Sequence, residues 1–115
     1  MNSNNFADGE MGWCSFHTPL RIYHQIWAGM IREGEHDDRV HPTQKPVKML
    51  GDVLKDFTEE NDVVIDVFGG SGSTLIACEQ LGRKCYMMEY DPHYCDVIID
   101  RWEKFTGEQA VLIDD

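Results

Sequence analysis

A short apolar run followed by a glycine-rich turn is the feature that most limits how this chain can fold. Residues 63–65 (Val-Val-Ile) precede residues 68–73 (Phe-Gly-Gly-Ser-Gly-Ser), and a helical pattern follows from about Thr74 to Leu81. An all-apolar run of this length is typical of a strand buried in a parallel sheet. Glycines permit positive φ angles and close approach of a ligand to the backbone, and the start of the helix offers N–H groups to an anion. The sequence therefore predicts a strand–turn–helix unit that binds a nucleotide-like ligand. The alternative is a turn that only permits tight packing.

The rest of the chain continues this alternation of strands and helices. Pro46 opens a helix whose apolar side chains share one face: Val47, Leu50, Val53, Leu54 and Phe57. Residues 85–88 (Cys-Tyr-Met-Met) are expected to form a second buried strand, and residues 110–113 a final one. Between them, large side chains recur at helical spacing: Tyr94, Val97, Ile98, Arg101, Trp102 and Phe105. This order predicts the α/β fold class, with a parallel, doubly wound sheet.

An acidic residue follows the second expected strand. Glu89 stands where nucleotide-binding α/β folds place an acid that accepts hydrogen bonds from ribose hydroxyls. Leu75 occupies the position of the third glycine in the dinucleotide-binding pattern G-x-G-x-x-G. That departure counts against another interpretation, in which the chain is a fragment of a nicotinamide-dependent oxidoreductase.

The first part of the chain gives weaker signals. We expect residues 1–12, which are rich in Asn and Gly, to be a disordered leader, and residues 32–40 to be a charged loop. Residues 13–31 fit both a helical and a strand period, and their aromatic and β-branched content favours a strand. Large side chains such as Trp13 and Trp27 predict an apolar surface that packs on another chain. The alternative is that this segment folds back over its own sheet.

Acidic residues are concentrated in the second half of the chain. Residues 1–50 carry six acids and five bases, whereas residues 51–115 carry fifteen acids and five bases, a net charge of −10. Such a surface repels the phosphate backbone, because nucleic-acid binding uses clustered Lys and Arg. The chain alone is therefore expected to be a poor DNA binder.

The cysteines indicate a reduced protein. The four of them, at positions 14, 78, 85 and 95, form no Cys-x-x-Cys pair, so neither a zinc ribbon nor a redox dithiol is expected. Cys14, His17 and His24 have metal-ligand chemistry but lack a fourth ligand, and we expect no metal site. No apolar run approaches the roughly 18 residues that span a bilayer. Together these features favour a cytoplasmic protein without membrane contact.

Three segments, in this order, resemble the consecutive motifs of DNA amino-methyltransferases. They are residues 41–46 (His-Pro-Thr-Gln-Lys-Pro), 66–74 (Asp-Val-Phe-Gly-Gly-Ser-Gly-Ser-Thr) and 88–91 (Met-Glu-Tyr-Asp). That family uses S-adenosylmethionine (SAM) to methylate adenine N6 or cytosine N4. The motif order is similar to the β-type arrangement, in which the catalytic half comes first and the cofactor half last. The resemblance implies that residues 13–115 form a partial SAM-dependent methyltransferase domain with a Rossmann-like sheet.

The resemblance also implies a role for each matching residue. The turn would surround the methionine part of SAM with Asp66, Phe68, Gly69, Gly70, Ser71, Gly72 and Ser73. Thr74 would cap the following helix. Glu89 would bind the ribose hydroxyls, with Tyr90 and Asp91 beside the adenine. The methionine end would be closed by His41, Pro42, Thr43, Gln44 and Lys45.

One motif of the family is absent from this sequence. The catalytic tetrapeptide [Asp/Asn/Ser]-Pro-Pro-[Tyr/Phe/Trp] grips the target amino group after base flipping, and no two of the four prolines here are adjacent. Residues 91–94 (Asp-Pro-His-Tyr) look similar but follow the second strand, so we expect Pro92 in a helix's first turn and Tyr94 on its packing face. The chain thus looks like the cofactor part of such an enzyme, either a fragment or a truncated, prophage-style frame. We predict that it holds no catalytic residues and is inactive alone.

The same resemblance sets the expected partners. DNA, in a restriction–modification or phage setting, would be bound only by a complete enzyme. A chain that supplies the missing catalytic half, or a second copy in a homodimer, would cover the apolar residues 13–31. The alternative function is a non-catalytic nucleotide-binding or interaction module that has kept the fold.

Overall fold

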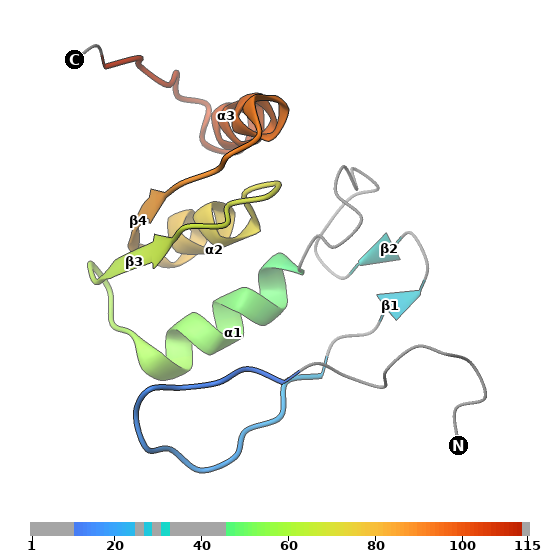
Figure 1. The fold of residues 1–115 in the computed structure, drawn as a ribbon, viewed down its shortest axis with the longest axis vertical. Coiled ribbons are helices and arrows are strands. Elements are labelled where there is room, and N and C mark those ends of the chain that lie inside the picture. Colours follow the sequence, from blue (N-terminus) through green and yellow to red (C-terminus); the bar gives the residue numbers. More distant parts are fainter. Residues whose placement is uncertain (1–10, 25–26, 29–30, 33–45, 114–115) are drawn as a thin grey trace.

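The computed structural model describes residues 11–24, 27–28, 31–32 and 46–113. Its elements follow in the order β1 (Trp27–Ala28), β2 (Ile31–Arg32), α1 (Val47–Phe57), β3 (Val63–Asp66), α2 (Ser73–Leu81), β4 (Lys84–Met87) and α3 (Pro92–Thr106). Figure 1 shows the two parallel strands β3 and β4 with α1, α2 and α3 around them. The predicted α/β class and the parallel pairing are confirmed.

The sheet formed by β3 and β4 is covered on one face. The strands pair in parallel with Val63 opposite Lys84 and Asp66 opposite Met87. Side chains alternate between exposed and half-buried along both strands, and Ile65 and Tyr86 are 70% and 63% exposed. We expected both strands to be buried and the sheet to be doubly wound. In the described part of the chain only one face of the sheet is covered, because α2 packs on that face and no described element lies on the other.

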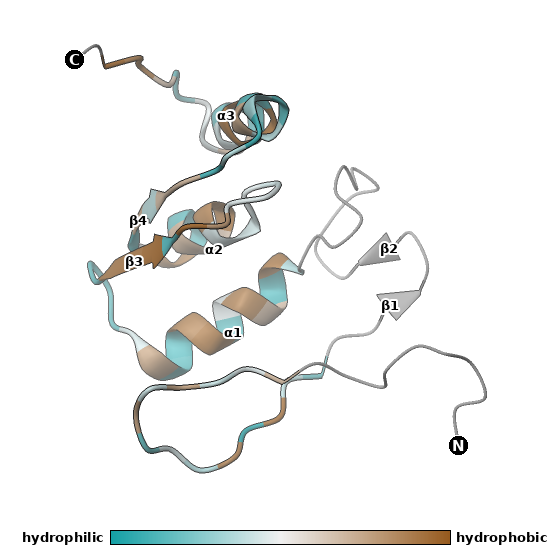
Figure 2. Ribbon diagram, viewed as in Figure 1, coloured by the Kyte–Doolittle hydropathy of each residue, from teal (hydrophilic) through white to brown (hydrophobic). Residues whose placement is uncertain are grey.

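The core lies between α1 and α2. Val47, Ile76 and Ala77 are buried, and Leu50 and Leu54 pack against them. The two helices approach closely, since a Cβ added at residue 51, which is glycine, would lie 3.5 Å from the Leu81 side chain. In Figure 2 the hydrophobic bands of α1 recur along the helix, as its predicted apolar stripe requires.

The end of α2 and the start of α3 follow from local sequence. Gly82, in the left-handed conformation at φ +75°, ends α2, and its N–H donates to the Cys78 carbonyl, as predicted. Asp91 caps α3 by accepting a hydrogen bond from the His93 N–H at 2.9 Å, and Pro92 stands in the first turn. The prediction that residues 91–94 begin a helix is therefore confirmed. At the other helix, Pro46 precedes α1 as its extended N-cap residue, one position before the predicted place.

Residues 110–113 do not form the predicted final strand. They adopt no regular structure, and Val111, Leu112 and Ile113 are 82–85% exposed. A β-strand needs hydrogen bonds from a neighbouring strand, and no described strand lies beside this segment. Apolar composition alone was therefore a misleading signal here.

The N-terminal segment packs on the end of α1 instead of forming one strand. Residues 11–24 contain neither helix nor strand, and the short β1 pairs antiparallel with β2. The Phe16 and Phe57 rings lie 5.2 Å apart, and the Tyr23 hydroxyl donates to Asp56 at 2.5 Å. The segment thus folds back on a helix end, which was not the predicted location. Among its large side chains Trp13, Leu20 and Ile22 remain 88%, 90% and 70% exposed.

No helix in the described residues combines the length and apolar character needed to cross a membrane. The predicted leader falls mostly outside the described residues, which begin at position 11.

Candidate functional site

The turn between β3 and α2 is closed by its own backbone. Asp66 ends β3, and its Oδ1 accepts a hydrogen bond from the Phe68 N–H at 2.9 Å. The Gly72 N–H donates to the Gly69 carbonyl at 3.0 Å, and the Gly69 N–H donates to the carbonyl of Met88 at 2.9 Å. The last bond ties the turn to the residue that follows β4. The turn therefore has one defined shape at the carboxyl ends of the two parallel strands, where open α/β sheets bind ligands.

Two positions in this turn require glycine for different reasons. Gly72 has φ +88°, a conformation that residues with a Cβ rarely adopt. A Cβ at Gly69 would lie 2.8 Å from side-chain atoms of Met87 and 3.1 Å from Ile98. The glycines found by sequence analysis thus serve both backbone conformation and close packing.

Glu89 lies directly against the turn. Its Oε1 accepts a hydrogen bond from the Gly70 N–H and its Oε2 accepts one from the Asp91 N–H, each at 2.8 Å. The carboxylate therefore joins the glycine turn to the start of α3. Each carboxylate oxygen can accept more than one hydrogen bond, so hydroxyl groups of a ligand can share these oxygens. The structure brings together the turn and the acid that the sequence predicted to act jointly.

The start of α2 differs from the prediction. The helix begins at Ser73 with Gly72 as the N-cap residue, and no side chain caps it. Thr74 was expected to be the cap but lies within the first turn, because the left-handed Gly72 already provides the entry into the helix. The N–H groups of this first turn therefore lack a capping side chain and can receive an anionic group.

Arg101 holds the turn from behind and was not among the predicted site residues. Its Nη1 donates to the Ser71 carbonyl at 3.1 Å and lies 3.2 Å from the Ser73 Oγ. Both serines are buried. The signal was present in the sequence, since Arg101 is a base within the expected packing stripe of the last helix. A charged side chain on such a face needs a polar partner.

The remaining predicted site residues lie next to the turn or are not among the residues that the structure describes. Phe68 and Tyr90 are 87% and 101% exposed. Asp91 caps α3 as described above, so its carboxylate already has a structural role. Residues 41–45, which were expected to close the methionine end, lie outside the described residues.

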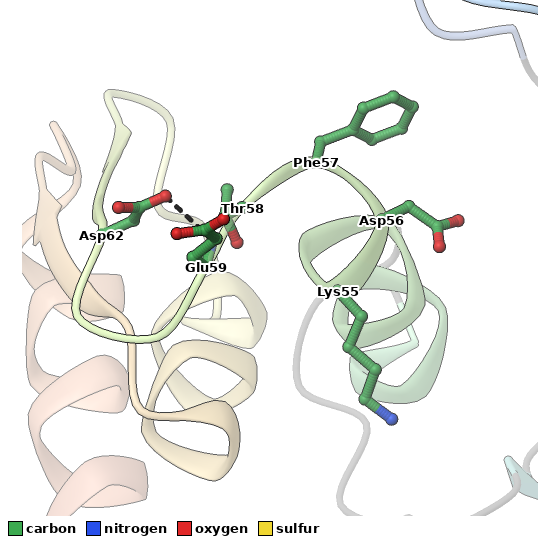
Figure 3. A pocket seen from close by; sticks show the side chains of 6 residues that line it. All are labelled: Lys55, Asp56, Phe57, Thr58, Glu59 and Asp62. Carbon is green, nitrogen blue, oxygen red and sulfur yellow. Dashed lines mark hydrogen bonds between the residues drawn. The ribbon is translucent and has the colours of Figure 1, made fainter.

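A hollow of about 440 Å³ lies at the end of β3 opposite to the glycine turn, and none of the residues predicted for the cofactor site lines it. Figure 3 shows its lining, which consists of Lys55, Asp56, Phe57, Thr58, Glu59 and Asp62. The Glu59 N–H donates to the Asp62 carboxylate at 2.9 Å across it. Asp62 precedes β3 whereas the glycine turn follows it, so this hollow and the turn are separate features.

Cys78 and Cys85 behave as packing residues. Burial raises the pKa of the Cys85 thiol to about 12, and burial likewise raises the pKa of Cys78 on α2. Such thiols stay protonated and are poor nucleophiles and metal ligands. Within the described residues no group of three or more His, Cys, Asp or Glu side chains could hold a metal ion.

The profile of a family described as DNA methylase, of the N6/N4 type, matches residues 16–100. The type II methyltransferase M.BglII of Bacillus subtilis is 36% identical over 73 residues, which cover 63% of this chain and 20% of that protein. The type II methyltransferase M2.LlaDCHI of Lactococcus lactis subsp. cremoris is 34% identical over 80 residues, which cover 69% of this chain and 30% of that protein. The chain thus spans less than a third of the length of these relatives.

Two solved structures share the fold of this part. The complex of M1.HpyAVI with SAM superimposes with a TM-score of 0.54 at 34% sequence identity, covering 56% of this chain and 32% of that one. The putative DNA modification methylase TTHA0409 of Thermus thermophilus, in complex with SAM, superimposes with a TM-score of 0.54 at 30% sequence identity, covering 60% of this chain and 29% of that one.

Proposed function

Because this chain belongs to the family of N6/N4 DNA methylases, we propose that it is the SAM-binding part of an enzyme that methylates adenine N6 or cytosine N4 in DNA. The observation that carries the proposal is the glycine turn held to Glu89 through the Gly70 N–H. A turn of fixed shape beside an acid at the end of the next strand suits a ligand that has both an anionic group and ribose hydroxyls.

In the proposed complex the turn and Glu89 divide the ligand between them. The turn and the uncapped start of α2 would receive the methionine part, whose carboxylate is attracted by helix N–H groups. Glu89 would accept hydrogen bonds from the ribose hydroxyls, and the exposed Tyr90 would lie beside the adenine, while Phe68 stays with the turn around the methionine part. Residues 41–45 would close the methionine end.

Calorimetric titration with SAM and with S-adenosylhomocysteine tests the proposal. The chain should bind both, and Glu89→Ala should lose roughly 1–3 kcal/mol of binding free energy because hydroxyl partners are left unpaired. Asp62→Ala is the matched control, since Asp62 also accepts a backbone N–H but lies before β3. Binding of NAD instead of SAM would favour a nicotinamide enzyme, and equal SAM affinity in Glu89→Ala would remove the ribose role.

The proposed part lacks the residues for the chemical step. No Pro-Pro pair occurs in the sequence, and the net charge of −10 over residues 51–115 disfavours contact with a duplex. We therefore expect no transfer of radiolabelled methyl groups to unmethylated DNA by this chain alone. Turnover that Asp91→Ala abolishes would show that residues 91–94 are catalytic after all. A complete enzyme would act in a restriction–modification or phage setting in the cytoplasm.

We also infer that a partner covers the apolar surfaces of this chain, either a polypeptide that carries the catalytic half or a second copy in a homodimer. Two apolar surfaces support this: the outer sheet face with Ile65 and Tyr86, and the N-terminal segment with Trp13, Leu20 and Ile22. Monomers rarely leave large apolar patches in water. The relatives are more than three times longer than the matched part, which leaves room for such a half. Light scattering and fluorescence quenching distinguish the outcomes. A homodimer would identify a second copy as the partner, and a monomer with both surfaces accessible to a quencher would leave the catalytic half as the partner. A monomer at high concentration with both surfaces shielded from the quencher would refute the inference.

A further inference from the structure

The back of the glycine turn is built by one face of α3. Arg101, which is half-buried, places its Nη1 3.1 Å from the Ser71 carbonyl, 3.4 Å from the Ser71 hydroxyl and 3.2 Å from the Ser73 hydroxyl. One turn earlier on the same helix, Ile98 lies where a Cβ of Gly72 would come within 3.2 Å. An apolar and a cationic side chain of α3 therefore support the turn.

The contact between Arg101 and the Ser71 carbonyl fixes more than one atom. In a trans peptide the C=O and the following N–H point in opposite directions. Holding the Ser71 carbonyl therefore also sets the direction of the Gly72 N–H, which closes the turn on the Gly69 carbonyl at 3.0 Å. Hydrogen bonds from a guanidinium are stronger than those between neutral groups. The end of the turn nearest α2 is thus held by hydrogen bonds from one cationic side chain of α3.

We propose that Arg101 is a positioning residue for the methionine part of SAM. This inference rests on the proposed function. Arg101 contacts Ser71 and Ser73, and it acts by keeping residues 71–73 and the start of α2 in the shape that receives the ligand. The other end of the site, where Glu89 holds the Gly70 N–H, has its own support. Loss of Arg101 should therefore affect the methionine end and spare the adenosine end.

Two ligands separate these ends. S-adenosylhomocysteine has the amino-acid part, whereas 5′-methylthioadenosine has the same nucleoside and sulfur without it. In Arg101→Met the Kd for S-adenosylhomocysteine should rise about tenfold, equivalent to about 1.4 kcal/mol, while the Kd for 5′-methylthioadenosine changes less than about twofold. Arg101→Lys keeps the charge but not the fork of donors, and it should recover part of the lost affinity.

Arg83 offers a matched control. Its guanidinium also holds backbone carbonyls, those of Thr58 and Leu81, at 2.7 Å each, but at the far end of the sheet. Arg83→Met should lower the unfolding temperature and leave the Kd values of both ligands within about twofold. A loss of S-adenosylhomocysteine affinity in Arg83→Met equal to that in Arg101→Met would show that general destabilisation is the cause, and would overturn the proposal.

The remaining outcomes are also decisive. If the unmodified chain binds neither ligand, the proposed function fails and this role fails with it. Should the unmodified chain bind both ligands while Arg101→Met binds them equally well, or loses both to the same extent, the role of Arg101 alone is refuted. If Arg101→Met does not fold by circular dichroism, Arg101→Lys must show the selective loss, at a smaller size, for the proposal to stand.

Discussion

Replacing Gly72 by alanine tests whether the turn is limited by backbone conformation, by packing on α3, or by both. Gly72 has φ +88°, and its added Cβ would lie 3.2 Å and 3.4 Å from two side-chain carbons of Ile98. Gly107, which ends α3 at φ +74°, has no atom within 4 Å of such a Cβ. The two glycines share the left-handed conformation and differ in their surroundings. Gly107→Ala therefore measures the backbone contribution alone.

The expected magnitudes follow from these distances. A residue with a Cβ in the left-handed conformation costs about 1–2 kcal/mol, and the stiffer unfolded chain returns about 0.4–1 kcal/mol. Gly107→Ala should thus lower the unfolding free energy by about 1 kcal/mol. Gly72→Ala adds an overpacked contact of about 1–3 kcal/mol, because its Cβ would lie 3.2 Å from the Ile98 side chain, which is closer than ordinary van der Waals contact. Its total should be about 2–4 kcal/mol.

Urea unfolding followed by circular dichroism measures both variants. Truncating the neighbour should remove the packing part, so the double variant Gly72→Ala with Ile98→Ala should show a favourable coupling energy in a double-mutant cycle. The pair Gly107→Ala with Ile98→Ala should be additive. Equal losses in the two glycine variants, or no coupling at residue 98, would refute the argument that α3 moulds the turn.

Two further predictions concern stability. Because burial raises the pKa of folded Cys85 to about 12 while an unfolded thiol ionises near 8.5, the folded state loses stability as the pH rises above about 9. Urea titrations at several pH values should show that the unfolding free energy falls more steeply at alkaline pH in the unmodified chain than in Cys85→Ala, and parallel curves would contradict this. Asp91→Ala removes the side-chain cap of α3 and should lower the unfolding free energy by about 1 kcal/mol, whereas Asp91→Ser should retain most of it; a loss of the same size in Asp91→Ser would show that the cap is not the cause.

The sequence predicted the elements whose signals are local. The glycine turn, the stop of α2 at Gly82 and the start of α3 at Asp91 each depend on backbone preferences of a few neighbouring residues. These preferences act wherever the segment is placed, so they could be identified without knowledge of the fold. The acid Glu89 was located for the same reason, since it directly follows a recognisable strand.

The elements that depend on distant neighbours were predicted less well. Residues 110–113 are apolar, yet a strand requires a partner that their own sequence does not specify. The outer faces of β3 and β4 were expected to be buried because apolar strands usually have cover on both sides. Arg101 was identified as a packing residue because periodicity reports which face a side chain occupies and not which atoms it meets.

The uncovered face of the β3–β4 sheet has a consequence for how the chain remains in solution. In the part of the chain that the structure describes, no strand pairs with the outer edges of β3 and β4, and their outward apolar side chains form a surface on which identical copies can pair. The excess of acids in the same half of the chain opposes that pairing through charge repulsion. Near the isoelectric point of about 4.7 this repulsion vanishes, and high salt screens it. The negative charge therefore opposes association between copies of the chain, while a partner with a surface complementary to the sheet can still displace water from it and bind.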